Sequence, residues 1–249
     1  MIELKNISKT FNRGEINEVQ ALQNIDLHIA EGTFLVLVGS NGSGKTTLLN
    51  VISGALTPSR GQIIFKGKEV TNLPEHKRSA WVARVFQDPL GGTAPDLSIL
   101  DNFRLAALRT RSKGLRIGIN EGFKQKVRDT IAELGLGLED QLQQPMGTLS
   151  GGQRQALTLL MSVMDHTDIL LLDEPTAALD PNAAAVVLRT AQKIIRRYRL
   201  TTIMITHNLS ESLQYGNRLI QMNRGKIVRD LDQDAKDQLK PEEMYQWFG

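Results

Sequence analysis

Short stretches of alternating apolar and polar residues fill the first 35 positions of the chain. Ile2, Leu4 and Ile7 form one such stretch, and residues 22–29 form another. Alternation with a period of two places the apolar side chains on one face of a strand. The polar residues between the stretches are typical of turns, so we expect antiparallel strands in this part of the chain.

A continuous apolar run at residues 34–38 is followed by a glycine-rich turn and by a helical pattern that begins near Lys45. Further apolar runs of strand length lie at residues 63–65, 81–86, 169–172 and 202–205. A helical pattern over residues 182–198 separates the last two runs, which is the strand–helix–strand order of a parallel sheet. These patterns predict an α/β fold with a parallel sheet flanked by helices.

Between residues 89 and 149 the apolar spacing changes to the helical period. We interpret residues 89–149 as an inserted helical subdomain. The whole chain, 1–249, then forms a single domain. Its core consists of residues 1–88 and 150–249 and includes the N-terminal antiparallel β subdomain.

Composition and charge exclude several classes of site. The 249 residues include no cysteine, which excludes disulfides, thiolate metal ligands and cysteine nucleophiles. The formal net charge of +3 is too small by itself to indicate a protein that wraps nucleic acid, and charge does not decide the partner. We expect no nucleic-acid partner. We interpret the basic residues Arg104, Arg109, Arg111, Lys113 and Arg116 as a solvated face.

The apolar runs are about the length of a strand, far short of the roughly 18 residues that cross a bilayer. The first ten residues carry Glu3, Lys5 and Lys9, so they lack the apolar core of a signal peptide. We therefore expect a cytoplasmic protein, and any role at a membrane must come through a partner.

Residues 39–46 match the phosphate-loop pattern G-x-x-x-x-G-K-[ST] at every fixed position, between a predicted strand and a predicted helix. Glycines allow successive backbone N–H groups and the helix N-terminus to face negative oxygens. Lys45 would pair the β- and γ-phosphates, and the Thr46 hydroxyl would hold a Mg²⁺ ion that bridges them. The predicted phosphate site consists of Gly39, Ser40, Asn41, Gly42, Ser43, Gly44, Lys45, Thr46 and Thr47.

Two carboxylates, Asp173 and Glu174, follow the apolar run at residues 169–172, where a parallel sheet opens to its ligand. Asp173 is the expected Mg²⁺ contact, through water, and Glu174 would orient or deprotonate an attacking water. Taken alone, an Asp-Glu pair before Pro175 is more often a solvated strand end. Its position after a phosphate loop favours a catalytic role.

Residues 149–153 read L-S-G-G-Q and are hard to explain by packing. Together with the two motifs above, this segment resembles the signature of the ATP-binding cassette family of transporter ATPases. The resemblance covers nearly the whole chain. Its features follow in the family order, namely the phosphate loop, Gln87, the signature, Asp173 with Glu174, Asp180 and His207.

The resemblance implies a P-loop NTPase that hydrolyses ATP with Mg²⁺ as a head-to-tail homodimer. In the family, the helix that starts at the signature caps the γ-phosphate bound by the second chain, with its N-terminal dipole end facing the anion. The signature residues that would do this are Ser150, Gly151, Gly152 and Gln153. Asp180 would then lie at the dimer interface.

Three further roles come from the same resemblance. Gln87 would reach the Mg²⁺ and the nucleophile, while it joins the core to the helical subdomain. His207 would contact the γ-phosphate and help to orient water and Glu174. Phe11 would stack on adenine where the family most often has tyrosine, and a stack needs only an aromatic face.

The resemblance also implies partners, namely two permease subunits and an extracytoplasmic substrate-binding protein, with the chain at the cytoplasmic face of the membrane. The segment that begins at Phe86 looks like a bacterial importer branch for amino acids of tryptophan or tyrosine type. A lipoprotein-release or efflux ATPase, which residues 11–22 resemble, and a soluble ATPase of cofactor assembly remain alternatives. A GTPase is disfavoured because no Asn-Lys-x-Asp segment occurs.

Overall fold

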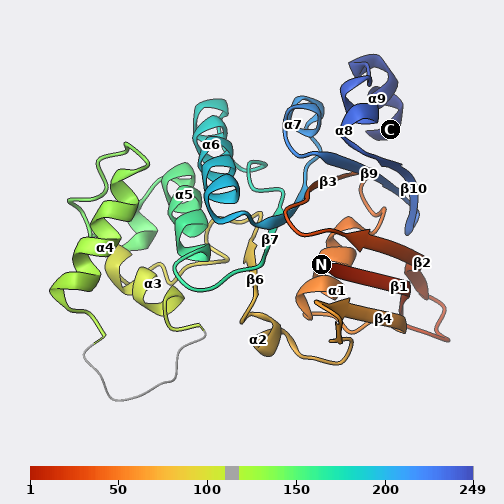
Figure 1. Ribbon diagram of the computed structural model, residues 1–249, viewed down its shortest axis with the longest axis horizontal. Coiled ribbons are helices and arrows are strands. Elements are labelled where there is room, and N and C mark those ends of the chain that lie inside the picture. Colours follow the sequence, from red (N-terminus) through yellow and green to blue (C-terminus); the bar gives the residue numbers. More distant parts are fainter. Residues whose placement is uncertain (110–117, 249) are drawn as a thin grey trace. The chain divides into compact units, whose positions relative to one another are not determined.

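The computed structural model describes residues 1–109 and 118–248 of the chain (Figure 1). The chain forms two compact units. Unit 1 combines Met1–Ser79 with Leu200–Gly249, and unit 2 is Ala80–Arg199. The predicted boundaries of a core and an inserted helical subdomain stay a prediction.

The N-terminal part of unit 1 is an antiparallel sheet with the strand order β2-β1-β4-β5. Its strands are β1 (Ile2–Phe11), β2 (Val19–Ile29), β4 (Arg60–Phe65) and β5 (Lys68–Glu69). Alternate residues of β2 near its end are buried, as the period-two pattern predicts. The predicted antiparallel β subdomain is therefore confirmed.

Unit 1 also contains a mostly parallel sheet with the strand order β10-β9-β3-β8. Its strands are β3 (Phe34–Val38), β8 (Thr201–Ile205), β9 (Arg218–Asn223) and β10 (Lys226–Leu231). Strand β3 pairs in parallel with β8 and β9, and β8 is buried at every position. Burial on both faces explains the continuous apolar runs in the sequence. The helices of this unit are α1 (Lys45–Ser53), α2 (Glu75–Arg78), α7 (Leu209–Gln214), α8 (Gln233–Asp237) and α9 (Pro241–Phe248).

Arg78 is fully buried and ties the end of α1 to a neighbouring loop. Its Nη1 donates to the carbonyls of Val51 and Ile52 in the last turn of α1, each at 2.9 Å. Its Nε and Nη2 donate to three carbonyls within residues 70–73. Burial lowers the pKa of Arg78 to about 10. A cation at a helix C-terminus interacts favourably with the helix dipole, so Arg78 stabilises the position of α1.

Lys236 of α8 plays a similar part at the end of α7. Its side chain is buried, and Nζ donates to the carbonyl of Tyr215 and, at 2.8 Å, to that of Gly216. Burial lowers the pKa of Lys236 to about 8. Two helices of unit 1 therefore end at a buried cation from another element.

Unit 2 contains the parallel strand pair β6 (Val82–Val85) and β7 (Ile169–Asp173) with a group of helices. The helices are α3 (Ile99–Ala106), α4 (Glu121–Ala132), the 3₁₀ turn η1 (Met146–Thr148), α5 (Gly151–Ser162) and α6 (Pro181–Tyr198). Helices α3, α4 and α6 all contact α5, which is central in this unit (Figure 1). The helical patterns predicted between residues 89 and 149 and over residues 182–198 are confirmed by α3, α4 and α6.

Of the basic stretch, the structure describes Arg104 and Arg109. Three of its residues lie outside the described part of the chain, namely Arg111, Lys113 and Arg116. The guanidinium of Arg104 lies over the ring of Phe123, 5.6 Å from its centroid. Arg109 is half-buried, so the interpretation as a solvated face is wrong at this position. No helix in the described part of the chain combines the length and hydropathy of a membrane span.

Candidate functional site

The phosphate loop lies between the end of β3 and the start of α1 in unit 1, as the sequence predicts. Gly39 has φ 144° and Gly44 has φ 102°, both in the region that favours glycine. A Cβ atom on Gly39 would lie 2.2 Å from the carbonyl oxygen of Met222, and one on Gly44 would lie 2.5 Å from that of Ala21. Glycine is required at both positions by backbone conformation and by space.

Polar groups of this loop suit an anion. Lys45 is 6% exposed, and its Nζ donates to the carbonyls of Gly39 at 2.7 Å and Ser40 at 3.0 Å. The buried Ser43 hydroxyl has no hydrogen-bond partner within the described residues. No side chain in the described part of the chain caps the start of α1. A phosphate would therefore meet a cation and the N–H groups of an uncapped helix N-terminus.

Phe11 ends β1 and pairs across the sheet with Val19 of β2. Lys9, two residues earlier on the same strand, places Nζ over the ring of Phe11 at 5.3 Å from its centroid. The same ammonium donates to the carbonyl of Thr57 at 2.8 Å. The ring is half-buried, so it keeps accessible surface for the predicted stack on a base.

His207 follows β8 at the strand end, where it is exposed. Neighbouring side chains fix the backbone on both sides of it. Thr206 Oγ1 donates to Glu211 Oε2 at 2.5 Å and accepts from the N–H of Asn208 at 3.0 Å. Asn208 caps α7 by accepting from the N–H of Glu211 at 3.2 Å. Sequence reasoning missed Thr206 and Glu211, although Asn-x-x-Glu before a helix is a capping signal.

The signature forms the N-terminus of α5 in unit 2. Ser150 Oγ accepts from the N–H of Gln153 at 3.2 Å, and Gln153 Oε1 accepts from the N–H of Ser150 at 3.0 Å. This reciprocal capping box explains the Ser and the Gln of the motif. The N–H groups of Gly151 and Gly152 belong to the first turn and have no partner within a helix, so they are suited to an anion.

Gly152 has a second role that the sequence did not reveal. A Cβ atom at this position would lie 2.5 Å from the Cβ of Ala183 in α6. Helices α5 and α6 therefore approach closely at their N-termini, and glycine permits that approach. Asp180 caps α6 by accepting from the N–H groups of Asn182 at 3.0 Å and Ala183 at 3.1 Å. Its predicted role at a dimer interface stays a prediction.

Asp173 is the last residue of β7, and it is buried. Its Oδ2 accepts from Arg84 Nη2 at 2.6 Å, and the Arg84 guanidinium lies over the ring of Phe86 at 4.7 Å from its centroid. Glu174, the next residue, is partly exposed and has φ 49°, a conformation uncommon for residues other than glycine. The chain therefore turns sharply at Glu174, directly after the strand.

Gln155 connects two of the predicted site segments inside unit 2. Its side chain is buried, and Nε2 donates to the carbonyls of Phe86 at 2.8 Å and Pro175 at 3.2 Å. These carbonyls belong to the residues directly before Gln87 and directly after Glu174. The exposed Gln87 and the turn at Glu174 are thus fixed to one side chain of the signature helix, a contact that sequence spacing did not indicate.

The predicted site residues are divided between the two units. Unit 1 holds Phe11, the phosphate loop and His207, and unit 2 holds Gln87, the signature, Asp173, Glu174 and Asp180. Within the described residues, no group of three or more His, Cys, Asp and Glu side chains could hold a metal. Asp173 in unit 2 and Thr46 in unit 1 each carry an oxygen donor of the kind that Mg²⁺ takes, and their role as metal contacts stays a prediction.

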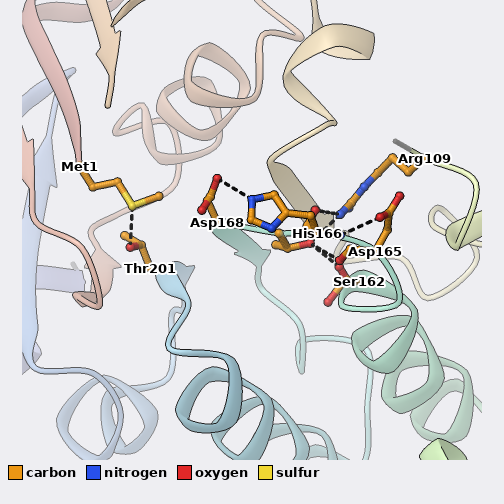
Figure 2. A network of polar contacts seen from close by, with 8 residues as sticks. Met1, Arg109, Ser162, Asp165, His166, Asp168 and Thr201 are labelled. Carbon is orange, nitrogen blue, oxygen red and sulfur yellow. Dashed lines mark hydrogen bonds and ion pairs between the residues drawn. The ribbon is translucent and has the colours of Figure 1, made fainter. Parts of the chain in front are cut away.

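Unit 2 also contains a cavity of about 450 Å³. It is lined by Arg84 and Arg109, by small residues of the segment after β6, and by residues of α3 and α5. Figure 2 shows Arg109 directed at the segment after α5, where Nη2 donates to the carbonyl of His166 and to Thr167 Oγ1, each at 2.6 Å. Burial lowers the pKa of Arg109, and the charge of Asp165 acts in the opposite direction.

Comparisons with known proteins agree with this geometry. The family model for the ABC transporter matches residues 22–177. A tyrosine transport ATP-binding protein of Clostridioides difficile is 41% identical over 253 residues, which cover 100% of this chain and 98% of that protein. A xylose/arabinose import ATP-binding protein, XylG of Sulfolobus acidocaldarius, is 33% identical over 230 residues, 92% of this chain and 86% of that protein.

Among solved structures, the fold resembles a dimeric post-hydrolysis state of the ATP-binding cassette MJ0796 bound to ADP and Pi. The TM-score is 0.79 at 27% identity, and the match covers 94% of this chain and 99% of that chain. The phosphate loop lies within the segment that the family model matches, as do the signature and the Asp173–Glu174 strand end. The chain belongs to the ABC transporter family, and it is an ATP-binding cassette that hydrolyses ATP to power transport.

Proposed function

We propose that the chain is the ATP-hydrolysing subunit of a bacterial importer for an aromatic amino acid of the tyrosine type. The relative with 41% identity over the whole chain is a tyrosine transport ATP-binding protein, and this observation supports the substrate class. The chain would act at the cytoplasmic face of the membrane with two permease subunits and an extracytoplasmic substrate-binding protein.

We assign the nucleotide to the phosphate loop because its buried cation and uncapped helix N-terminus suit phosphate oxygens. Phe11 would stack on the adenine. When bound, Mg²⁺ supplies positive charge that neutralises the β- and γ-phosphates. Thr46, Gln87 and Asp173 would hold it, and the contact of Asp173 would pass through water.

Glu174 would accept a proton from the attacking water, because a carboxylate at the carboxyl end of a strand can act as a general base. Gln155 would keep the backbone at Pro175, and with it Glu174, in position. His207 would contact the γ-phosphate. The hydrogen bonds of Thr206 and Asn208 restrict the backbone on either side of it.

The two anion sites belong to different units, and this supports a head-to-tail dimer in which each ATP lies between two chains. The signature end of α5 carries N–H groups suited to an anion and has a capped, preorganised geometry. In this proposal it binds the γ-phosphate held by the phosphate loop of the partner chain.

The cavity of unit 2 is the proposed contact for a permease subunit. Arg84 and Arg109 give it positive charge, and its described lining includes no Asp or Glu. Leu105, which also lines it, is 53% exposed. An apolar segment that carries a carboxylate would complement both properties.

The test of the composite site uses Glu174→Gln. Removal of the base should leave ATP binding intact, abolish turnover and accumulate a dimer in the presence of ATP and Mg²⁺. Size-exclusion chromatography with light scattering measures the dimer, and phosphate release measures turnover. A variant that binds ATP, stays monomeric and hydrolyses at the parental rate would overturn both the base and the dimer.

The substrate class is tested by uptake of labelled tyrosine in cells that lack this chain. The parental chain should restore uptake, and the Glu174→Gln chain should not. Labelled xylose is the matched control because a relative with 33% identity is a xylose/arabinose import protein. Restoration of xylose uptake in place of tyrosine uptake would reject the amino-acid proposal and leave the ATPase assignment unchanged.

A further inference from the structure

A buried ion pair joins the two strands of unit 2. Arg84 lies on β6 and Asp173 ends β7, and the two strands pair in parallel with Arg84 opposite Leu171. Arg84 Nη2 and Asp173 Oδ2 are 2.6 Å apart, and the two side chains are only 12% and 11% exposed. A charge-assisted hydrogen bond at this length, shielded from water, is strong.

A contact with an aromatic ring limits the movement of the Arg84 guanidinium. It lies over the ring of Phe86 at 4.7 Å from the centroid, a cation–π geometry. The carbonyl of Phe86 is in turn held by Gln155 at 2.8 Å. The ring of Phe86, whose backbone is held by Gln155, therefore positions the Arg84 guanidinium. The guanidinium in turn pairs with the Asp173 carboxylate.

The same arginine lines the cavity of about 450 Å³, together with Arg109. Arg84 therefore faces two places, the proposed metal contact at Asp173 and the proposed permease contact in the cavity. Because the described lining includes no acidic residue, a carboxylate that entered the cavity would meet the guanidinium groups of Arg84 and Arg109. It would compete with Asp173 for the Arg84 guanidinium.

We propose that Arg84 is a positioning residue for ATP hydrolysis that withholds the Asp173 carboxylate from the metal until a carboxylate of the permease segment binds in the cavity. The proposal rests on the function proposed above, in which Asp173 contacts Mg²⁺ and the cavity receives the permease. The physical basis is competition, because a carboxylate oxygen paired to a guanidinium at 2.6 Å is a weaker partner for a second cation.

The first experiment measures Mn²⁺ binding to the isolated chain by electron paramagnetic resonance, with a non-hydrolysable ATP analogue present. Arg84→Met should tighten Mn²⁺ binding by roughly tenfold, the scale of one lost hydrogen bond to a charged group. Arg84→Lys keeps the charge and should restore the parental affinity. Unchanged or weaker Mn²⁺ binding by Arg84→Met would overturn the proposal.

Arg109→Met is the matched control, because it removes a cation from the same cavity while its hydrogen bonds go to His166 and Thr167. Its Mn²⁺ affinity should equal that of the parental chain. Thermal unfolding without metal checks that each variant is folded, and Arg84→Gln replaces Arg84→Met if the latter does not fold. A tightening by Arg109→Met equal to that of Arg84→Met would show a general effect of cavity charge and reject the specific role of Arg84.

The second experiment repeats the Mn²⁺ titration on the complex purified with its permease from membranes. The parental complex should bind Mn²⁺ as tightly as the isolated Arg84→Met chain does. In the complex, Arg84→Met should not tighten Mn²⁺ binding further, so the effects of the substitution and of the permease are not additive. Equal affinity of the complex and the isolated parental chain, or additive effects, would overturn the proposal. If no permease accompanies the chain, or the parental chain binds no Mn²⁺ with the analogue, the function proposed above fails instead.

Discussion

The phosphate loop and the signature are both helix N-termini prepared for an anion, yet they are built differently. The loop encloses a buried lysine, and Gly39 and Gly44 lie against backbone carbonyls of other strands. The signature carries no cation among its five residues, and its serine is exposed. The first site supplies a cation as well as N–H groups, whereas the second supplies N–H groups without a cation. Affinity for the nucleotide should therefore depend on the first site, and turnover on both.

The largest expected effect concerns the anchoring of α1, which starts at the phosphate loop. Arg78→Leu should lower the free energy of unfolding by roughly 3–5 kcal/mol, because it leaves five carbonyls, four of them at buried contacts, without this donor. Chemical denaturation with circular dichroism measures this. Arg197→Leu is the control, since that arginine forms an exposed pair with Glu133, and it should cost less than about 1 kcal/mol. Equal losses in both variants would show that Arg78 does not anchor α1.

Lys45→Ala tests the site that carries charge. Loss of the ammonium should weaken ATP binding by roughly a hundredfold, the scale of charged hydrogen bonds to two phosphates. Titration with a fluorescent ATP analogue measures the dissociation constant. Ser150→Ala in the other site should leave that constant unchanged in the isolated chain. A folded Lys45→Ala variant with parental affinity would place the phosphates elsewhere.

The buried cation at the end of α7 predicts a pH dependence. The pKa of Lys236 is about 8 in the folded chain, below the ordinary value of 10.5, so the unfolded chain binds more protons between these two values. Stability should therefore rise as the pH increases from 8 toward 10.5, by an amount on the order of 2 kcal/mol from this group. Urea denaturation of the parental chain and of Lys236→Met across this range isolates the contribution. If the stability of the parental chain and that of Lys236→Met rose equally with pH, Lys236 would not be the cause of the pH dependence.

The smallest expected effect concerns the signature cap. Ser150→Ala removes the acceptor for the N–H of Gln153 and should cost about 1 kcal/mol of stability. Ser150→Thr keeps an acceptor and should restore most of that loss. Steady-state ATPase activity should fall in the alanine variant, since the second site acts in turnover. Parental ATPase activity in Ser150→Ala would remove the signature hydroxyl from the reaction.

The comparison also indicates what the sequence can predict. The phosphate loop was recognisable because its glycines and its lysine are close in the sequence and their spacing follows from local backbone geometry. The antiparallel strands and the helices were recognisable from the periods of two and 3.6 residues. Local rules of this kind explain why the capping box of Ser150 and Gln153 agrees with the motif read from the sequence.

Contacts between distant residues were not recognisable in this way. Arg84 and Asp173 are separated by 89 positions, and Gln155 contacts carbonyls 69 and 20 positions away. Their meeting depends on which strands and helices are neighbours, which no spacing rule encodes. Arg109 was misinterpreted for the same reason, because its partners at His166 and Thr167 lie more than 50 positions further along the chain.

The close approach of α5 and α6 has a consequence for sequence variation. Because a Cβ atom at Gly152 would lie 2.5 Å from that of Ala183, the two positions share space for a single methyl group. A homologous chain with alanine at the first position can keep the same helix spacing only with glycine at the second. Alanine at position 152 is therefore expected to occur during evolution only together with glycine at position 183, because methyl groups at both positions would clash.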